Sequence, residues 1–293
     1  VFSQFTYAEG DSGFAVDNTD LRYADATIVN GKSLQYGITL DNNPTVGDLW
    51  NSTPAWSYPY SSSDVAPEPG ADSLVGSLGG AVAGLGAYGM LDGKYYGHVA
   101  LYRNTSVNSA AGSTNVIDGV APYWRLAWQK NIGTSYLMLG TYGLDAKVIP
   151  DAMTVAGGIG GPTARYLDTA LDFQYERPVT GNTSLVAHGS FTRERRSDVD
   201  ADGAYLAGSR ETWKFSKVDV EYNMGRWRPG LAAFNTDTAS DGLDSRGYLL
   251  SVGYFPWQNL ELDLQYRGYT KFDGTSANAG DNDSVYLGLW LMI

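Results

Sequence analysis

The chain has 293 residues, a formal net charge of −12 and no cysteine. Disulfides, thiolate metal sites, cysteine nucleophiles and covalently attached c-type haem are therefore excluded on this chain. The acidic balance argues against nucleic acid as a partner, because nucleic acids select basic surfaces.

Apolar and polar residues alternate along most of the chain, and this period of two is typical of β-strands. The alternation is clear in "LDTALDFQYE" (167–176), "VDVEYN" (218–223) and "LELDLQYRGY" (260–269). No stretch approaches the roughly 18 apolar residues of a transmembrane helix. The pattern predicts about fourteen strands: 1–8, 19–29, 33–41, 81–92, 94–104, 119–130, 133–147, 163–177, 182–195, 208–224, 226–237, 244–256, 259–271 and 283–293.

The expected connections alternate between short turns and long polar loops. The long ones are 10–19, 42–80, 104–119, 150–163, 197–210, 237–246 and 272–283. This alternation predicts an all-β fold, a transmembrane antiparallel up-and-down β-barrel that occupies residues 1–293 as one domain. We expect it in a bacterial outer membrane, with the short turns periplasmic and the long loops extracellular.

Aromatic residues gather near the ends of the expected strands. They include Trp213, Trp227 and Trp257, and they fit the aromatic girdles of membrane barrels. The alternative is that Trp and Tyr are simply favourable in strands. Strand sequence begins at once at Val1, so we expect either a complete barrel or one that lacks N-terminal hairpins.

The polar face of the strands should line the barrel lumen, which fourteen strands make too wide for side chains alone to fill. These residues could form an ion-selective filter or merely a wetted wall. The candidates are Asp168, Asp172, Glu176, His188, Asp219, Glu221, Glu261, Asp263 and Arg267.

The loop at 42–80 is unusually aromatic and rich in proline. It contains Trp50, Trp56, Tyr58 and Tyr60. Because so aromatic a loop is unfavourable in free solution, we expect it to fold into the barrel mouth as a constriction or lid.

Two further patterns suggest metal or cofactor sites. His98 and His188 are the only histidines, and they could ligate haem iron or a metal, or be unrelated. Asp198, Asp200 and Asp202 in "DVDADG" match the first half of a calcium loop. The glutamate that should complete this loop is out of register, so an ordinary acidic loop is the alternative. No catalytic motif is present, and we do not expect an enzyme.

The stretch "LRYADATIVNGKSLQYGITLDNNPTVGDLWNSTPAWSYPYSSSDVAP", followed by "VAGLGAYGMLDGKYYGHVALYR", resembles a family of outer-membrane cytochrome c proteins. These are porin-like barrels preceded by a segment with one Cys-x-x-Cys-His haem site, similar to the fused cytochrome–porins of iron-oxidising bacteria. The resemblance covers about residues 20–103. It implies two further strands before this chain, and so a sixteen-stranded parent. This chain has no haem motif, so haem c would come from an absent N-terminal segment or a partner cytochrome.

The resemblance implies that the barrel is the porin part of an extracellular electron-transfer conduit, a sheath that insulates haem from lipid. The alternative is a passive or substrate-specific diffusion porin for small polar solutes or ions. An outer-membrane enzyme or an adhesive barrel is a third hypothesis. Expected partners are outer-membrane lipid and lipopolysaccharide, a c-type cytochrome, and further copies of the chain in a homotrimer.

Overall fold

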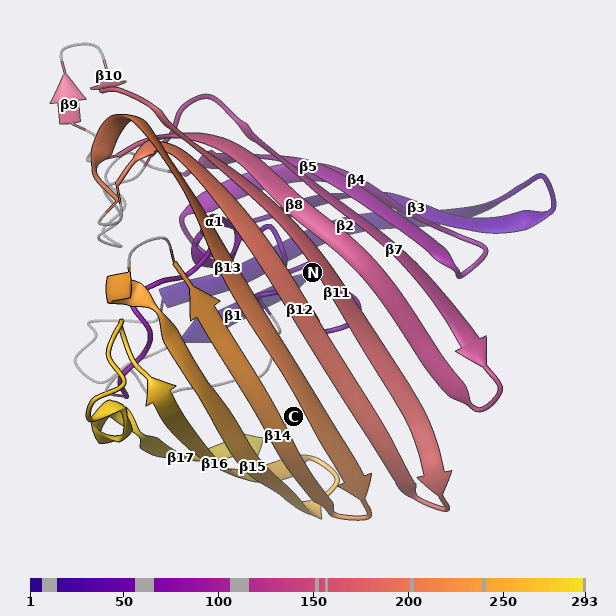
Figure 1. Ribbon diagram of the computed structural model, residues 1–293. Coiled ribbons are helices and arrows are strands. Elements are labelled where there is room, and N and C mark those ends of the chain that lie inside the picture. Colours follow the sequence, from indigo (N-terminus) through magenta and orange to yellow (C-terminus); the bar gives the residue numbers. More distant parts are fainter. Residues whose placement is uncertain are drawn as a thin grey trace.

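Most of the chain is strand in the structure, which is a computed structural model (Figure 1). Among the helices of the described residues, none is long and apolar enough to cross a membrane. The residues that the structure describes are 1–6, 15–55, 66–105, 116–150, 153–155, 158–200, 203–238 and 241–291.

Within these described ranges, fourteen strands follow one another along the main path of the sheet, and three short strands and three short helices lie between them. The main strands are β1 (Phe2–Thr6), β2 (Ala15–Val29), β3 (Lys32–Asp41), β4 (Val82–Leu91), β5 (Tyr95–Asn104), β7 (Ala121–Ile132), β8 (Ser135–Ile149), β11 (Ala164–Thr180), β12 (Thr183–Val199), β13 (Tyr205–Met224), β14 (Trp227–Asp237), β15 (Ser245–Trp257), β16 (Leu260–Lys271) and β17 (Ser284–Leu291). The others are β6 (Val116–Ile117), β9 (Met153–Val155), β10 (Gly158–Gly160), α1 (Leu74–Ser77), η1 (Asp241–Leu243) and η2 (Ala279–Asn282).

Each main strand pairs with the next in the chain, and β6 pairs with β8, so that one sheet of 15 strands results. Every pairing in it is antiparallel, for example that of β11 with β12. This confirms the predicted all-β, up-and-down antiparallel fold. In the described part of the chain the sheet curls without closing, because the edge strands β1 and β17 do not pair with each other.

Three of the predicted long loops contain strand: β2 already begins inside 10–19, 150–163 contains β9 and β10, and 197–210 is largely strand. Residues 197–210 were expected to form a long loop, but β12 continues to Val199 and β13 already begins at Tyr205. The two strands pair as far as Val199 and Tyr205, with an irregularity after Ser197. Asp198, at this irregularity, has φ 62°, which aspartate tolerates better than most residues. The Asp- and Gly-rich sequence suggested a loop here, yet it forms an irregular strand end.

The two faces of the sheet have opposite polarity. On β11, Leu171 is 65% exposed, whereas Asp168 and Asp172 are 0% and 3% exposed. On β16, Leu264 is 51% exposed while Gln265 is 3% exposed. Charged and polar residues thus face the concave side, and apolar residues face outward, the reverse of the arrangement in a soluble β-sandwich.

The aromatic residues near strand ends divide between the two faces. Trp227 and Trp257 are 48% and 68% exposed and flank short turns. Trp213 is only 3% exposed, because it shares the concave face of β13 with Asp219 and Glu221. Its expected place in an outer girdle was therefore wrong.

Two glycines on the convex face allow a test of this packing. A Cβ atom on Gly143 would lie 2.2 Å from Trp124 Cζ2 and 2.4 Å from Asp168 O, whereas one on Gly97 would meet only Leu126 Cδ2, at 3.7 Å. Gly143→Ala should therefore lower the free energy of unfolding in detergent by about 1–3 kcal/mol. Urea titration of both variants checks this, and an equal effect of Gly97→Ala would contradict it.

Candidate lumen constriction

The described parts of the loop between β3 and β4, residues 42–55 and 66–80, lie inside the curl of the sheet. Its two ends are held together where it leaves the strands, since Gly80 donates its N–H to Asn42 O at 3.0 Å. Asn42 in turn donates its N–H to Thr19 O at 3.2 Å, which ties the entrance of the loop to β2. Between these ends, the loop contacts the wall at three places.

Asp48 organises the first part of the loop. Its carboxylate accepts backbone N–H groups from Trp50, Ser52 and Thr53 at 3.3, 2.9 and 3.1 Å. Asp is well suited to this role, because its short side chain reaches the backbone of the residues that follow it. This turn presents Trp50 and Ser52 to the wall.

The first contact is centred on Arg125 of β7. Its Nη2 lies 2.8 Å from Asp48 Oδ1 and 2.9 Å from Asp172 Oδ2, and its Nη1 donates to Asp172 Oδ1 at 3.1 Å. Ser52 Oγ donates to Asp172 at 2.6 Å. The Arg125 and Asp172 side chains are 2% and 0% exposed. One buried cation therefore joins a carboxylate of the loop to a carboxylate of the wall.

Trp50 extends this contact along the wall. It is 4% exposed, and its Nε1 donates to Gln129 Oε1 at 2.8 Å and to Tyr136 OH at 2.6 Å. Its ring meets Tyr96 edge to face, with the centroids 5.4 Å apart. The Arg125 guanidinium lies 5.1 Å from the indole centroid. Trp50 is thus held by β5, β7 and β8 together.

The second contact is made by α1, which packs against β8, β11 and β12. Leu74 N–H donates to Glu194 Oε2 at 2.6 Å, and Val75 N–H donates to Asp168 Oδ2 at 2.8 Å. These wall carboxylates satisfy amide groups that have no partner within so short a helix. Glu194 is also paired with Arg196, whose guanidinium lies 3.1 Å from the Trp213 ring centroid.

The third contact lies on the opposite side of the curled sheet, on β16 and the segment after it. Glu68 pairs with Arg267 at 3.2 Å, and Tyr269 OH donates to Pro67 O at 2.9 Å. Gly70 N–H donates to Asp273 Oδ1 at 3.0 Å. The described parts of the loop therefore contact both sides of the curled sheet, β7 on one side and β16 on the other.

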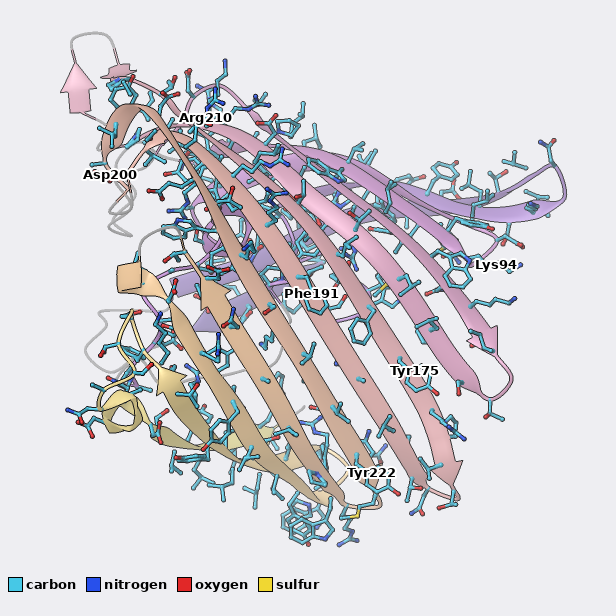
Figure 2. All side chains as sticks on the ribbon, viewed as in Figure 1. Lys94, Tyr175, Phe191, Asp200, Arg210 and Tyr222 are labelled. Atoms are coloured by element: carbon cyan, nitrogen blue, oxygen red, sulfur yellow. The ribbon has the colours of Figure 1, made fainter. Side chains whose placement is uncertain are left out.

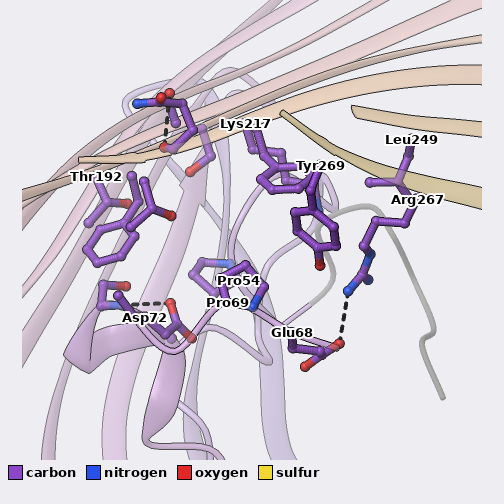
Figure 3. A pocket seen from close by; sticks show the side chains of 18 of the residues that line it. Pro54, Glu68, Pro69, Asp72, Thr192, Lys217, Leu249, Arg267 and Tyr269 are labelled. Atoms are coloured by element: carbon purple, nitrogen blue, oxygen red, sulfur yellow. Dashed lines mark hydrogen bonds and ion pairs between the residues drawn. The ribbon is translucent and has the colours of Figure 1, made fainter. Parts of the chain in front are cut away.

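A cavity of about 360 Å³ remains between the loop and the wall of β12–β16. Figure 3 shows Pro54, Pro69 and Glu68 on its loop side, with Lys217 and Tyr269 opposite them. The cavity carries both signs of charge and is lined by hydroxyl, amide and aromatic groups. Such a lining suits small polar solutes and ions in water.

The remaining predicted lumen residues lie on the concave face but do not contact the loop in the described residues. His188 Nδ1 lies 2.8 Å from Asp219 Oδ2. Glu261 pairs with Arg228, and Glu221 lies 4.0 Å from the same guanidinium. Glu176 and Asp263 accept hydrogen bonds from nearby glutamine side chains, Gln174 and Gln265 respectively.

Some of the predicted loop residues and calcium ligands lie outside the described residues, and the others have structural roles. Trp56, Tyr58, Tyr60 and Asp202 lie outside the described residues. Asp198 accepts Gly208 N–H at 2.7 Å and Asp200 accepts Ala204 N–H at 2.9 Å, so both carboxylates stabilise the strand connection. In the part of the chain that the structure describes, no group of three or more His, Cys, Asp or Glu could hold a metal ion.

The two histidines are on separate strands, β5 and β12. His98 is 5% exposed and packs edge-on against Tyr123, with the ring centroids 5.5 Å apart. Within the described residues, its Nε2 has no hydrogen-bond partner. His188 is held by Asp219, and no described contact joins the two imidazoles.

Sequence reasoning did not single out Asp48, Glu194, Arg196 or Lys217. For three of them, the sequence offered one signal, which was their position in the alternation of inward and outward residues along the strand. Counting in steps of two from His188 places Glu194 and Arg196 on the inner face, and counting from Asp219 does the same for Lys217. Asp48 carried no such signal, because its role depends on the fold of the loop.

A scan of known protein families finds none that matches this chain. A comparison with curated proteins also finds no match. The resemblance to cytochrome–porins therefore remains a hypothesis.

Removing the central cation should release the loop. Arg125→Gln leaves two buried carboxylates without their cation, which should destabilise loop docking by about 3–5 kcal/mol. Limited proteolysis within 42–80 should accelerate, and Trp50 fluorescence should shift to the red. Arg165→Gln is the matched control, since that arginine pairs with Asp145 on the exposed face and should have little effect. Unchanged proteolysis of Arg125→Gln would contradict the assigned role.

The pH should also affect the loop, through Asp72. Asp72 is exposed at the edge of the cavity. Removal from bulk water by the surrounding protein still raises its pKa from 3.8 to about 6, the backbone N–H of Ser73 lowers it, and the nearby Glu194 raises it further. Ionised Asp72 is therefore unfavourable in the folded state at neutral pH. As the pH falls from about 6 towards 3.8, the folded chain binds a proton that the unfolded chain does not, and this penalty disappears.

Asp72→Asn should consequently raise the melting temperature above that of the unmodified chain at neutral pH. The difference should shrink as the pH falls through about 6 and vanish below the ordinary aspartate value. Melting curves of both proteins over this range measure the effect. A difference that does not change with pH would refute it.

Proposed function

We propose that this chain is a membrane-spanning barrel through which small polar solutes or ions diffuse, and that the 42–80 loop constricts the passage. The observation that carries the proposal is the polarity of the sheet. Leu171 and Leu264 face outward, while Asp172 and Glu261 face inward. An apolar exterior over many strands is unfavourable in water, whereas it matches the hydrocarbon of a bilayer. We place the short turns in the periplasm and the long loops outside the cell.

The constriction supports diffusion rather than complete closure. On one side the loop contacts Arg125 of β7 and, through α1, Asp168 of β11; on the other side it contacts Arg267 of β16. Among the described residues, a cavity remains beside β12–β16. A membrane location also requires the edges of β1 and β17 to be closed, because unpaired strand edges do not occur in lipid.

The electron-conduit function remains a second proposal. It rests on the resemblance over about residues 20–103, and it needs haem c supplied by another segment or a partner cytochrome. An absorption spectrum of the protein purified from its native membrane distinguishes the two. A haem Soret band would favour the conduit, and a colourless, conducting protein would favour the diffusion porin.

Conductance across a planar bilayer tests diffusion and its path together. Lys217 lines the cavity on the inner face of β13, while Lys214 lies exposed on its outer face. Lys217→Gln should raise the cation-to-anion permeability ratio about 2- to 10-fold, because a charge within about 4–8 Å changes an ion's energy by roughly 0.5–1 kcal/mol in water. Lys214→Gln should leave the ratio unchanged.

The reversal potential in a salt gradient gives this ratio for each variant. If the unmodified chain inserts but does not conduct, diffusion is the wrong function. If it conducts and both lysine variants behave alike, the ions do not pass through the described cavity.

A further inference from the structure

Five exposed cations gather on the convex face of the sheet, near the rim that carries the long loops. We call Arg193, Arg195, Arg210, Lys214 and Arg246 the rim patch. All five are exposed. They come from β12, β13 and β15 and lie on the convex face, whereas the neighbouring Glu194 and Arg196 are buried on the concave face. In a chain with net charge −12, such a local excess of positive charge is unexpected.

The pairing of β12 with β13 brings Arg193, Arg195, Arg210 and Lys214 close together. Arg193 lies directly opposite Lys214, and Ser197, two residues beyond Arg195, lies opposite Arg210. Like charges in directly opposed positions destabilise a sheet. Lys214 pairs with Asp237 at 2.9 Å, but in the described residues no carboxylate forms an ion pair with Arg193, Arg195 or Arg210. This local conflict suggests that a ligand supplies the missing negative charge.

Between the rim patch and the short turns, the convex face of the same strands is apolar. Phe191, Val218 and Leu250 are 46%, 39% and 48% exposed. Figure 2 shows Phe191 about midway along the strands and Arg210 near the rim with the long loops. The rim patch therefore lies along the boundary between the apolar band and the rim.

We propose that the rim patch binds the phosphate groups of a phosphorylated glycolipid in the outer leaflet, whose acyl chains lie against the apolar band. This inference rests on the proposed membrane location. Arginine suits phosphate because its guanidinium donates two parallel hydrogen bonds. A lipid fits better than free phosphate, because cations and apolar band are contiguous on one face.

The test uses the folded full chain in detergent, titrated with bisphosphorylated lipid A. Binding is measured as lipid retained per protein after gel filtration. The combined substitution Arg193→Gln, Arg195→Gln, Arg210→Gln should weaken binding at least about tenfold, because each cation near an anionic headgroup contributes substantially. Lipid A stripped of both phosphates should bind the unmodified chain as weakly as intact lipid A binds this variant.

A matched control removes three cations from the opposite rim. Lys130, Arg177 and Arg226 are exposed near short turns, and their combined change to Gln should leave lipid A binding intact. Equal weakening by both triple variants would show that only net charge matters, and would overturn the proposal. Equal binding of lipid A with and without its phosphates would also overturn it. A third contrary result is that inorganic phosphate competes with lipid A equally well on the unmodified chain and on the variant.

Folding and the proposed function are checked separately. Circular dichroism and heat-dependent gel migration must match those of the unmodified chain, and Arg193→Lys, Arg195→Lys, Arg210→Lys should keep most of the binding because it keeps the charge. Conductance of the glutamine variant should be unchanged, since the rim patch lies outside the lumen. If the chain does not conduct but still binds lipid A through the rim patch, the proposed diffusion function is refuted and the lipid-binding proposal stands.

Discussion

The position of the loop depends on one buried cation. Arg125 lies between Asp48 of the loop and Asp172 of the wall, at 2.8 and 2.9 Å. A buried guanidinium without carboxylates would be strongly unfavourable, and so would either carboxylate without the guanidinium. The three groups are therefore stable together only when the loop is inside the curl of the sheet. The charged residues of the wall and the position of the loop thus depend on each other, because each buried charge needs its partner.

Other carboxylates of the wall also hold the loop, but they accept hydrogen bonds from its backbone N–H groups. Asp168 and Glu194 accept the N–H groups of Val75 and Leu74, which α1 cannot satisfy by itself. A segment of irregular backbone inside a barrel needs such partners, because an unpaired buried amide is unfavourable by about 1–3 kcal/mol. The acidic inner wall is thereby a structural support for the loop on one side of the lumen. Beside the cavity, by contrast, the charged groups of the wall are the cations Lys217 and Arg267.

The sequence predicted the strands and their faces where the alternation was uninterrupted, as in 167–176 and 260–269. Each step of two keeps a side chain on the same face, so Asp168 and Glu261 could be placed without knowing which strands pair. The alternation failed at 197–210, where charged residues occupy both faces and composition resembles a loop. The partners of the loop could not be predicted either. Arg125 and Asp48 meet across 77 residues of chain only because the sheet curls, and no local pattern encodes that.

The hydrogen bond between Gly70 and Asp273 joins residues 203 positions apart. It cannot form until β16 has been synthesised and paired, whereas the hairpin of β4 and β5 needs only neighbouring chain. Contacts of such long range form late, because the entropy of closing the intervening chain must be overcome first. The contact of the loop with Asp273 therefore becomes possible only after β16 has paired. The contacts with Arg125 of β7 and with Asp168 of β11 do not require that strand.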